Sequence, residues 1–347
     1  MTMTIRYTLT SLTAAAALAL SSGIALAQEV TLRLHQFLPA QANVPRLVLD
    51  VWADNVERDS GGRIRVERYA AMALGGTPPE LMDQVIDGIA DLAWTVNGFT
   101  PGRFPRTEVF ELPFFVEDAR AASYAYRTMY ESQMAETEFA DVVVLGNWVH
   151  GPGVIHTSRP VQTIEDMRGL KLRTPSRMVG QFLGILGAEP IGMPVTAIPE
   201  NLSRGVIDGA VIPWEVTASL RVPELVQNHT EFESSYPYTV TFTLSMNRER
   251  YESLPDDLRA VIDQNSGLEF SVFAGGTQAD SDGPARQLAV DRGNNIITIP
   301  EAEVAAWRTA AQPIYDTWIA DMAAQGIDGQ ALIDEARRLM AEYEAAN

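Results

Sequence analysis

Residues 166–176, Asp-Met-Arg-Gly-Leu-Lys-Leu-Arg-Thr-Pro-Ser, combine a short strand with the start of a helix. Two leucines alternate with Lys171 and Arg173, which is the period-two pattern of a strand with one apolar face. Pro175 comes two residues after Arg173 and, with Ser176, predicts the start of a helix over residues 176–186. Arg173 is therefore expected at a strand end beside a helix start, where its planar guanidinium can bind a carboxylate through two parallel bonds. The alternative is a surface arginine paired with an acidic side chain.

The alternation of strand and helix continues on both sides of this stretch. A period of two predicts strands at 30–35 and 63–69, an apolar run predicts a buried strand at 92–96, and we expect two further strands at 142–148 and 154–157. Helical patterns predict helices at 45–58, 79–87 and 199–204, and a mainly helical last third that includes 301–324 and 329–345. This order of elements predicts an α/β fold with mostly parallel sheets covered by helices.

The composition narrows the class of protein. The chain has 347 residues, of which 46% are apolar and 20% charged, the balance of a globular protein. Its 45 acidic and 26 basic residues give a formal charge of −19, which argues against nucleic acid or an anionic membrane surface as partner. The lack of cysteine excludes disulfides, and the four histidines have no zinc-site spacing. No motif for a nucleophile, a dinucleotide or a phosphate loop occurs, so we expect a binding protein without metal or cofactor.

The N-terminal residues 1–27 have the pattern of a secretory signal peptide. Arg6 provides the positive start, residues 12–20 an apolar run, and residues 25–27, Ala-Leu-Ala, the small residues before a cleavage site. We expect cleavage after Ala27 and a mature protein in the periplasm. An uncleaved membrane anchor is the weaker alternative, because the run is short and rich in alanine. No later segment is apolar enough to insert into a membrane.

Two segments of the chain are similar, at residues 85–91 and 205–210. In both, a helix ends at a glycine and an aspartate precedes an apolar strand. An aromatic residue follows in each case, Trp94 or Trp214. A common helix-to-strand corner would account for the pattern. The alternative is that two similar lobes each direct such a strand at a shared cleft.

Seven short motifs, in this order and spacing, resemble the solute-binding proteins of tripartite ATP-independent periplasmic (TRAP) transporters from about residue 30 onward. They are Gly61-Gly-Arg-Ile64, Leu74-Gly-Gly76, Glu80-Leu81, Gly88-Ile-Ala-Asp91, Glu111-Leu-Pro-Phe-Phe115, Gly169-Leu-Lys-Leu-Arg173 and Gly205-Val-Ile-Asp-Gly209. The resemblance implies a two-lobed fold like that of periplasmic binding proteins, with discontinuous lobes, a hinge and a long helix that crosses both lobes. It also implies that the lobes close over a small organic acid and that the loaded protein docks on membrane permease subunits.

The resemblance further implies where the chain divides. Lobe one is expected to comprise residues 28–149 and 240–277, and lobe two residues 150–239 and 278–347. The chain would then cross between the lobes near residues 150, 239 and 278.

The same resemblance assigns candidate ligand contacts. In this family the arginine of the Gly-x-Lys-x-Arg motif binds the ligand carboxylate, a role that falls on Arg173. A second arginine of the sialic-acid binders falls on Gly153 here, and an asparagine of many members falls on Ile212. These two departures argue against a dicarboxylate or a highly polar sugar acid.

The remaining positions expected near the cleft are mostly aromatic: Phe37, Trp94, Trp148 and Trp214. Aromatic walls and one arginine suit a monocarboxylate with a flat or apolar body. A betaine-like zwitterion is the alternative, with its cation over a ring or beside Glu215. Asn97 and His156 are candidate hydrogen-bond partners, and purely structural roles are the alternative for both, as core packing is for Trp148. An exported ligand sensor and a secreted enzyme with an unmarked carboxylate pair remain the alternatives to transport.

Overall fold

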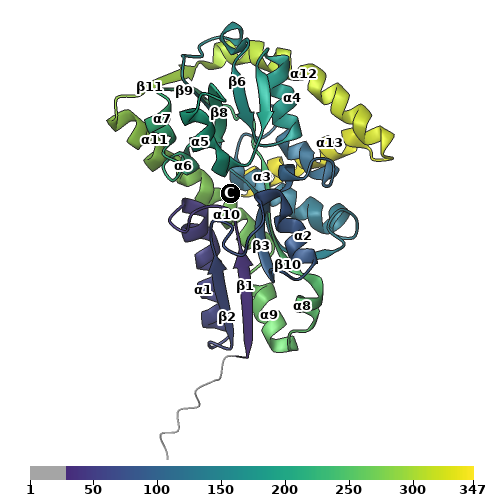
Figure 1. Ribbon diagram of the computed structural model, residues 1–347. Coiled ribbons are helices and arrows are strands. Elements are labelled where there is room, and N and C mark those ends of the chain that lie inside the picture. The colour runs from purple at the N-terminus through teal and green to yellow at the C-terminus, as the bar shows by residue number, and fades with distance from the viewer. Residues whose placement is uncertain (1–28) are drawn as a thin grey trace, which may run out of the picture.

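The computed structural model describes residues 29–347, so the predicted signal peptide and its cleavage site lie outside the described residues. The described chain forms two lobes, each built on one β-sheet (Figure 1). The sheet of lobe one has five strands in the order β2-β1-β3-β10-β4, and that of lobe two has six in the order β11-β9-β5-β8-β6-β7. The predicted two-lobed α/β fold is thus confirmed.

Lobe one contains residues 30–149 and a later segment, residues 241–280. Its strands are β1 (Val30–His35), β2 (Ile64–Tyr69), β3 (Leu92–Val96), β4 (Val142–Val149) and β10 (Thr241–Asn247). Its helices are α1 (Asp50–Asp59), α2 (Leu81–Ile86), α3 (Ala119–Met129), α8 (Arg248–Glu252), α9 (Asp256–Gln264) and α10 (Leu268–Asp280). Short 3₁₀ or π turns complete it: η1 (Pro45–Leu49), η2 (Pro78–Glu80), η3 (Asn97–Phe99), η4 (Pro105–Glu111) and η5 (Tyr130–Met134).

Lobe two contains the middle of the chain and returns near its end. Its strands are β5 (Gly153–Thr157), β6 (Lys171–Thr174), β7 (Glu189–Gly192), β8 (Gly209–Pro213), β9 (Asn228–Phe232) and β11 (Asn295–Ile299). Its helices are α4 (Arg177–Ile185), α5 (Ile198–Ser203), α6 (Trp214–Thr217), α7 (Val222–Leu225), α11 (Asp282–Asp291) and α12 (Glu301–Ala324). Two further turns are η6 (Ile164–Met167) and η7 (Val195–Ala197).

The sheets are mixed rather than mostly parallel, which corrects the sequence-based expectation. Parallel pairs join β1 to β2 and β3, β6 to β7 and β8, and β9 to β11. Every antiparallel pair involves either β10 or β5. These two strands come directly after the chain has entered a lobe from the other one. They therefore run against strands that are connected within a lobe by helical crossovers.

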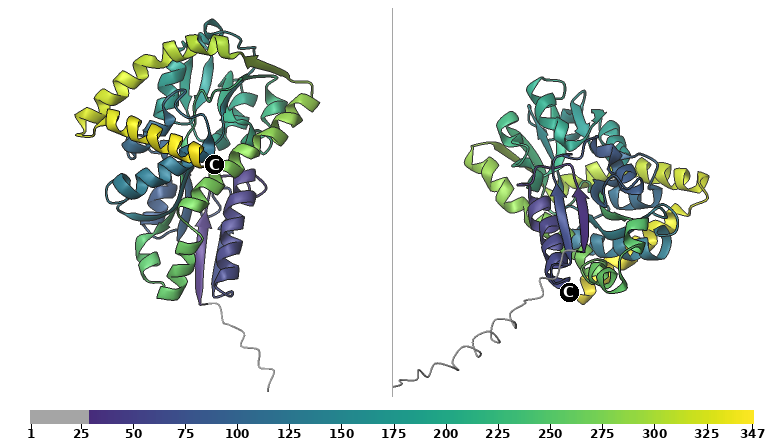
Figure 2. Two further views of the ribbon diagram at one scale, coloured as in Figure 1. Left: turned by 180° about the vertical axis from the view of Figure 1, so that it is seen from behind. Right: turned by 60° about the horizontal axis from the view of Figure 1, so that its bottom comes forward.

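The described part of the chain, residues 29–347, passes from one lobe to the other at three places near the cavity. The first lies between β4 and β5, the second between β9 and β10, and the third is the junction of α10 and α11 at Ser281. Helices α10 and α11 run from lobe one into lobe two almost without interruption (Figure 2). Together they form the long helix that crosses both lobes.

The C-terminal helix α13 (Gly329–Ala346) departs from the predicted division of the chain. Helix α12 packs against α4 of lobe two, and α13 then turns back and packs against α3 and η4 of lobe one. Its buried face consists of Leu332, Ile333, Ala336, Leu339 and Met340. The chain segment predicted for lobe two from residue 278 onward therefore returns to cover lobe one, and the remaining lobe boundaries stay a prediction.

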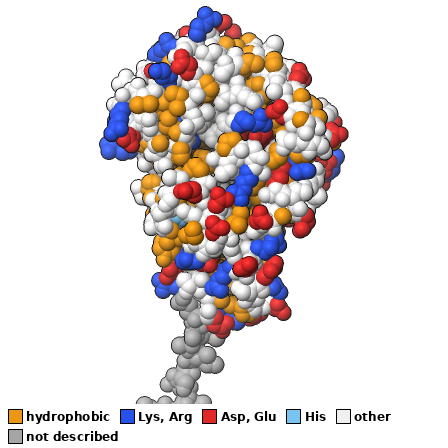
Figure 3. Space-filling model, turned by 45° about the vertical axis from the view of Figure 1, so that its right-hand side comes forward, with side chains coloured by type: hydrophobic (Ala, Val, Ile, Leu, Met, Phe, Trp, Pro, Cys, Tyr) orange, Lys and Arg blue, Asp and Glu red, His pale blue; other side chains and the backbone are white. Residues whose placement is uncertain are grey.

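The surface reflects the mixed charge of the chain. On the face shown in Figure 3, acidic and basic side chains are interspersed. Among residues 29–347, no helix combines the length and the apolar character needed to cross a membrane.

Candidate ligand-binding site

A cavity lies between the lobes, where strands of both sheets end. Phe37 follows β1 and Trp94 lies on β3, while Arg173 on β6 and Ile212 on β8 face them from lobe two. The empty volume of this region is about 420 Å³, which includes space that is open to solvent. The carboxyl ends of strands are the usual place for a ligand in α/β sheets. Its polar lining residues are His150, Arg173, Glu215, Tyr238 and Gln278.

Arg173 provides the positive charge of this cavity. Its side chain is buried, with 2% of the residue exposed, whereas Lys171 two residues earlier on the same strand is exposed. Nε donates to the carbonyl oxygen of Met193 at 2.9 Å and Nη1 to that of Val211 at 3.1 Å. No ion pair joins Arg173 to a carboxylate among the described residues, and burial lowers the pKa of its guanidinium to about 10. A buried cation without a counter-ion is costly, so the site is suited to an anion.

Stacked aromatic rings form the opposite wall. Phe37 stacks on Trp94 with ring centroids 4.5 Å apart, and Phe99 meets Phe37 edge to face at 5.4 Å. Phe242 lies beside Trp94 at 5.4 Å. Because these rings support one another, they present a rigid apolar surface that a flat ligand can cover.

The three crossings between the lobes each contribute a polar side chain to the cavity. These residues are His150, Tyr238 and Gln278, and sequence reasoning did not single them out. Burial lowers the pKa of His150 to about 4, so its imidazole is neutral, and Nδ1 donates to the carbonyl oxygen of Gly151 at 2.5 Å. The crossings predicted near residues 150, 239 and 278 could have pointed to these three residues, because the segments that cross between lobes border the space between them.

Glu215 lies at the start of α6 and is fully buried in the same lining. Its Oε1 accepts a hydrogen bond from Gln278 at 2.9 Å, whereas its Oε2 has no partner in the described part of the chain. Burial raises the pKa of Glu215 to about 7. Asp282 accepts from the backbone N–H of Glu215 at 2.7 Å, and burial raises the pKa of Asp282 to about 8. Both carboxyl groups therefore hold a proton through much of the range below neutral pH.

These raised pKa values predict a pH dependence of stability. A carboxyl whose pKa is higher in the folded state stabilises the fold fully below its unfolded pKa and loses that contribution as pH rises through the folded pKa. We expect Glu215→Gln to unfold much like the wild type at pH 5 and to be more stable than it at pH 8.5, by up to about 3 kcal/mol. Urea unfolding at both pH values measures this difference.

The control for this experiment is the same substitution at the exposed Glu249. Other buried groups also titrate, since burial raises the pKa of Glu111 to about 7 and lowers that of His229 to about 4. The comparison between variant and wild type cancels their contributions. A gap between Glu215→Gln and wild type that is equal at pH 5 and pH 8.5 would contradict the expectation.

The structure brings together four of the eight predicted contact residues. Phe37, Trp94, Arg173 and Glu215 line the cavity. Trp148 lies behind Trp94, with parallel rings 6.3 Å apart, and its Nε1 donates to Gln278 at 2.9 Å. Trp148 therefore supports the aromatic wall from the core.

The other three predicted contacts are turned away from the cavity lining. Trp214 packs against His156 and His229 at 5.0 Å each, and its Nε1 donates to Glu231 at 3.2 Å. His156 shares a hydrogen bond with His229, at 2.7 Å between their Nδ1 atoms, and a second with the carbonyl oxygen of Ile212. Asn97 donates to the Tyr126 hydroxyl at 2.6 Å. Their polar groups are occupied within their own lobes, which is the structural alternative to ligand contact.

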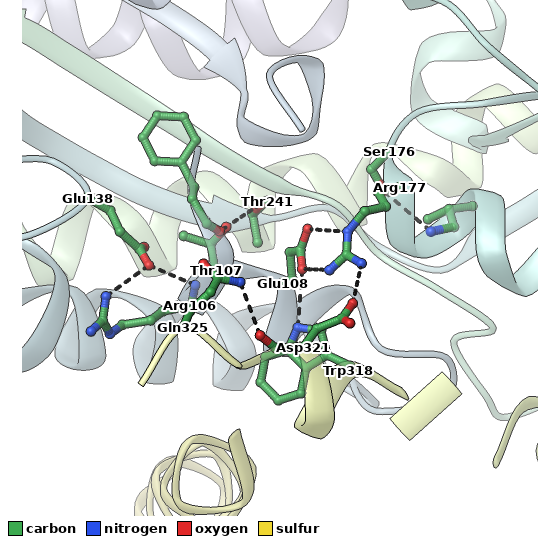
Figure 4. Close-up of polar contacts among 12 residues, drawn as sticks. Arg106, Thr107, Glu108, Glu138, Ser176, Arg177, Thr241, Trp318, Asp321 and Gln325 are labelled. Atoms are coloured by element: carbon green, nitrogen blue, oxygen red, sulfur yellow. Dashed lines mark hydrogen bonds and ion pairs between the residues drawn. The ribbon is translucent and has the colours of Figure 1, made fainter. Parts of the chain in front are cut away.

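Direct polar contacts hold the two lobes together around the cavity. Arg177 on α4 forms two bonds to Glu108 on η4 of lobe one, and a third to Asp321 at 2.8 Å (Figure 4). The Trp318 indole N–H also donates to Glu108 at 3.2 Å. On another side, Asn43 of lobe one donates to the Glu215 carbonyl oxygen at 2.8 Å. The two lobes thus contact each other on two sides of the cavity.

The chain is similar in sequence and in fold to known solute-binding proteins. Residues 38–321 match the family model of the bacterial extracellular solute-binding proteins, family 7. A TRAP solute-binding protein from Rhodoferax ferrireducens T118, solved with copurified benzoate, is 46% identical with a TM-score of 0.89, over 91% of this chain and 99% of that one. A marine metagenome TRAP solute-binding protein specific for aromatic acid ligands, solved with 3-hydroxybenzoate, is 41% identical with a TM-score of 0.88, over the same shares.

A curated relative is more distant in sequence. The C4-dicarboxylate-binding periplasmic protein DctP of Rhodobacter capsulatus is 24% identical over 263 residues, which are 75% of this chain and 78% of that protein. The family model covers most of the chain, and the similar structures have the same two lobes. This chain therefore belongs to family 7 of the bacterial extracellular solute-binding proteins, the TRAP transporter receptors, which bind their solute and do not transform it.

Proposed function

We propose that this TRAP solute-binding protein captures an aromatic monocarboxylate in the periplasm and delivers it to its membrane permease. The observation that carries the proposal is the buried guanidinium of Arg173, which has no counter-ion among residues 29–347 and faces stacked rings across the cavity between the lobes. The carboxylate would bind the free N–H groups of Arg173, and the ring of the ligand would cover Phe37 and Trp94. The benzoate and 3-hydroxybenzoate found in two similar proteins support this class of ligand.

The charges around the cavity favour a single carboxylate on the ligand. Arg173 is the one cationic side chain of the lining among the described residues. Glu215 lines the same cavity, and Asp282 contacts its backbone. A second ligand carboxylate would be buried without a cation and near two acidic groups, which costs several kcal/mol. A ligand ammonium group is also poorly served, because burial favours the neutral form of Glu215.

The proposal predicts an order of affinities that isothermal titration calorimetry can measure. We expect benzoate and 3-hydroxybenzoate to bind most tightly. Cyclohexanecarboxylate should bind roughly 3- to 10-fold more weakly, because it lacks a flat π-face for the stacked rings. Terephthalate should bind roughly 100-fold more weakly or worse, since its second carboxylate must be desolvated without a partner.

Glycine betaine serves as the control for the zwitterion alternative, and we expect it to give no heat of binding. A terephthalate or betaine affinity equal to that of benzoate would contradict the proposed ligand class. The proposal also includes export with cleavage after Ala27, a position outside the described residues.

A further inference from the structure

The phenol ring of Tyr238 occupies the space in which a side chain at position 153 would begin. A Cβ added to Gly153 would lie 2.1 Å from Cε1 and 2.3 Å from Cζ of Tyr238. Gly153 does not have a positive φ, so its backbone conformation is open to any residue. Position 153 therefore requires glycine for a steric reason, because the Tyr238 ring fills the space that a side chain would need.

The hydroxyl of Tyr238 is a buried polar atom without a partner. The residue is 2% exposed, and no hydrogen bond is formed by its OH among the described residues. Buried phenols normally find a hydrogen-bond partner, because an unsatisfied hydroxyl costs free energy. The backbone fixes this position, since the N–H of Gly153 donates to the Tyr238 carbonyl oxygen at 3.1 Å.

Tyr238, in the connection between β9 and β10, and Arg173 on β6 both line the cavity near the same end of β8. Gly153 is the first residue of β5 and pairs with Pro213 of β8. Arg173 on β6, on the other side of β8, extends its Nη1 to the carbonyl oxygen of Val211 near the same strand end. Burial raises the pKa of Tyr238 and the charge of Arg173 opposes that shift, so the two groups are within electrostatic reach of each other.

We propose that the Tyr238 hydroxyl donates a hydrogen bond to the ligand carboxylate that Arg173 binds. The inference rests on the proposed function and adds a second, neutral donor to the anchor. The carboxylate is then held by one cation and one directional O–H, and the total positive charge at the anchor stays at that of a single guanidinium. This arrangement neutralises one ligand carboxylate and provides no cation for a second one.

The decisive variant is Tyr238→Phe, which keeps the ring over Gly153 and removes only the oxygen. A hydrogen bond to a charged acceptor predicts that the Kd for benzoate rises roughly 10- to 100-fold. The melting temperature of the ligand-free protein should not fall, because the lost hydroxyl has no partner. Calorimetry with benzoate and a thermal melt without ligand provide the two readouts. The matched control is Tyr236→Phe, the same change at a half-buried residue outside the lining, with an unchanged Kd.

A second test addresses the contact between the ring and Gly153. Gly153→Ala should displace the phenol and weaken benzoate binding, whereas the same change should cost no further affinity in a Tyr238→Ala background. A Tyr238→Phe protein that binds benzoate within twofold of the wild-type Kd would overturn the inference while leaving the proposed function intact. A wild-type protein that binds neither benzoate nor 3-hydroxybenzoate would overturn both.

Discussion

Arg173→Met is expected to weaken benzoate binding by roughly 100-fold or more. Arg173 is a buried cation in the cavity lining, and losing one partner of a desolvated charge pair costs 2–5 kcal/mol or more, about 30- to several-thousand-fold in Kd. The ligand-free protein should be far less affected. Methionine fills a similar volume and removes a buried charge, which offsets the loss of the bonds to Met193 and Val211. We expect its free energy of unfolding to stay within about 2 kcal/mol of the wild type.

Titration calorimetry and urea unfolding of the same preparations separate these two effects. Arg173→Lys tests the geometry of the anchor, because lysine keeps the charge but cannot form two parallel bonds to a carboxylate. Its affinity should lie between those of wild type and Arg173→Met. The control Arg103→Met removes an arginine that pairs with Asp83 away from the cavity, and its Kd should not change. A wild-type Kd for benzoate in Arg173→Met would refute the anchor role.

Trp94→Ala is expected to lower the free energy of unfolding by about 3–5 kcal/mol and to reduce benzoate affinity as well. Trp94 is 1% exposed and contacts the rings of Phe37, Trp148 and Phe242 at centroid distances of 4.5, 6.3 and 5.4 Å. Its removal opens a cavity in lobe one and leaves the other rings unsupported. Urea unfolding without ligand measures the first effect and calorimetry the second.

Trp94→Phe is the matched control for this large substitution. Within residues 29–347 the indole N–H of Trp94 has no hydrogen-bond partner, so phenylalanine removes ring area without breaking a polar contact. We expect it to retain more than half of the stability that Trp94→Ala loses. A loss below about 1 kcal/mol in Trp94→Ala would mean that the ring stack contributes little to lobe one, contrary to its burial.

The sequence was informative where strand periodicity and strand ends determine the position of a side chain. Arg173, Trp94 and Phe37 were all predicted from such positions, and they line the cavity. Trp214 and Glu215 show the limit of this reasoning. Both lie in the first turn of α6, where neighbouring residues point about 100° apart, and the exact start of the helix decides which of them meets the cavity.

The remaining site residues depend on features that only the folded chain shows. His150, Tyr238 and Gln278 come together because three crossings separated by long stretches of sequence meet at one hinge. The pairing of β4 with β10 shifts register between Leu244 and Ser245. Simple alternation along β4 therefore does not predict which face of the sheet carries the Trp148 side chain. Strand β10 was missed although its Thr and Ser residues alternate with Phe, Leu and Met. Its antiparallel direction follows from tertiary connectivity that no local pattern contains.

The bare charge of Arg173 has a consequence for how the receptor distinguishes loaded from empty states. When the lobes meet, as the Arg177–Glu108 and Asn43–Glu215 contacts hold them, the guanidinium is cut off from water. Closure around nothing leaves that charge uncompensated, whereas closure around an anion neutralises it. In the proposed binding mode, an electrostatic penalty therefore opposes closure without a ligand, and the ligand carboxylate removes that penalty. A permease that binds only the closed form would therefore seldom bind a receptor that carries no ligand.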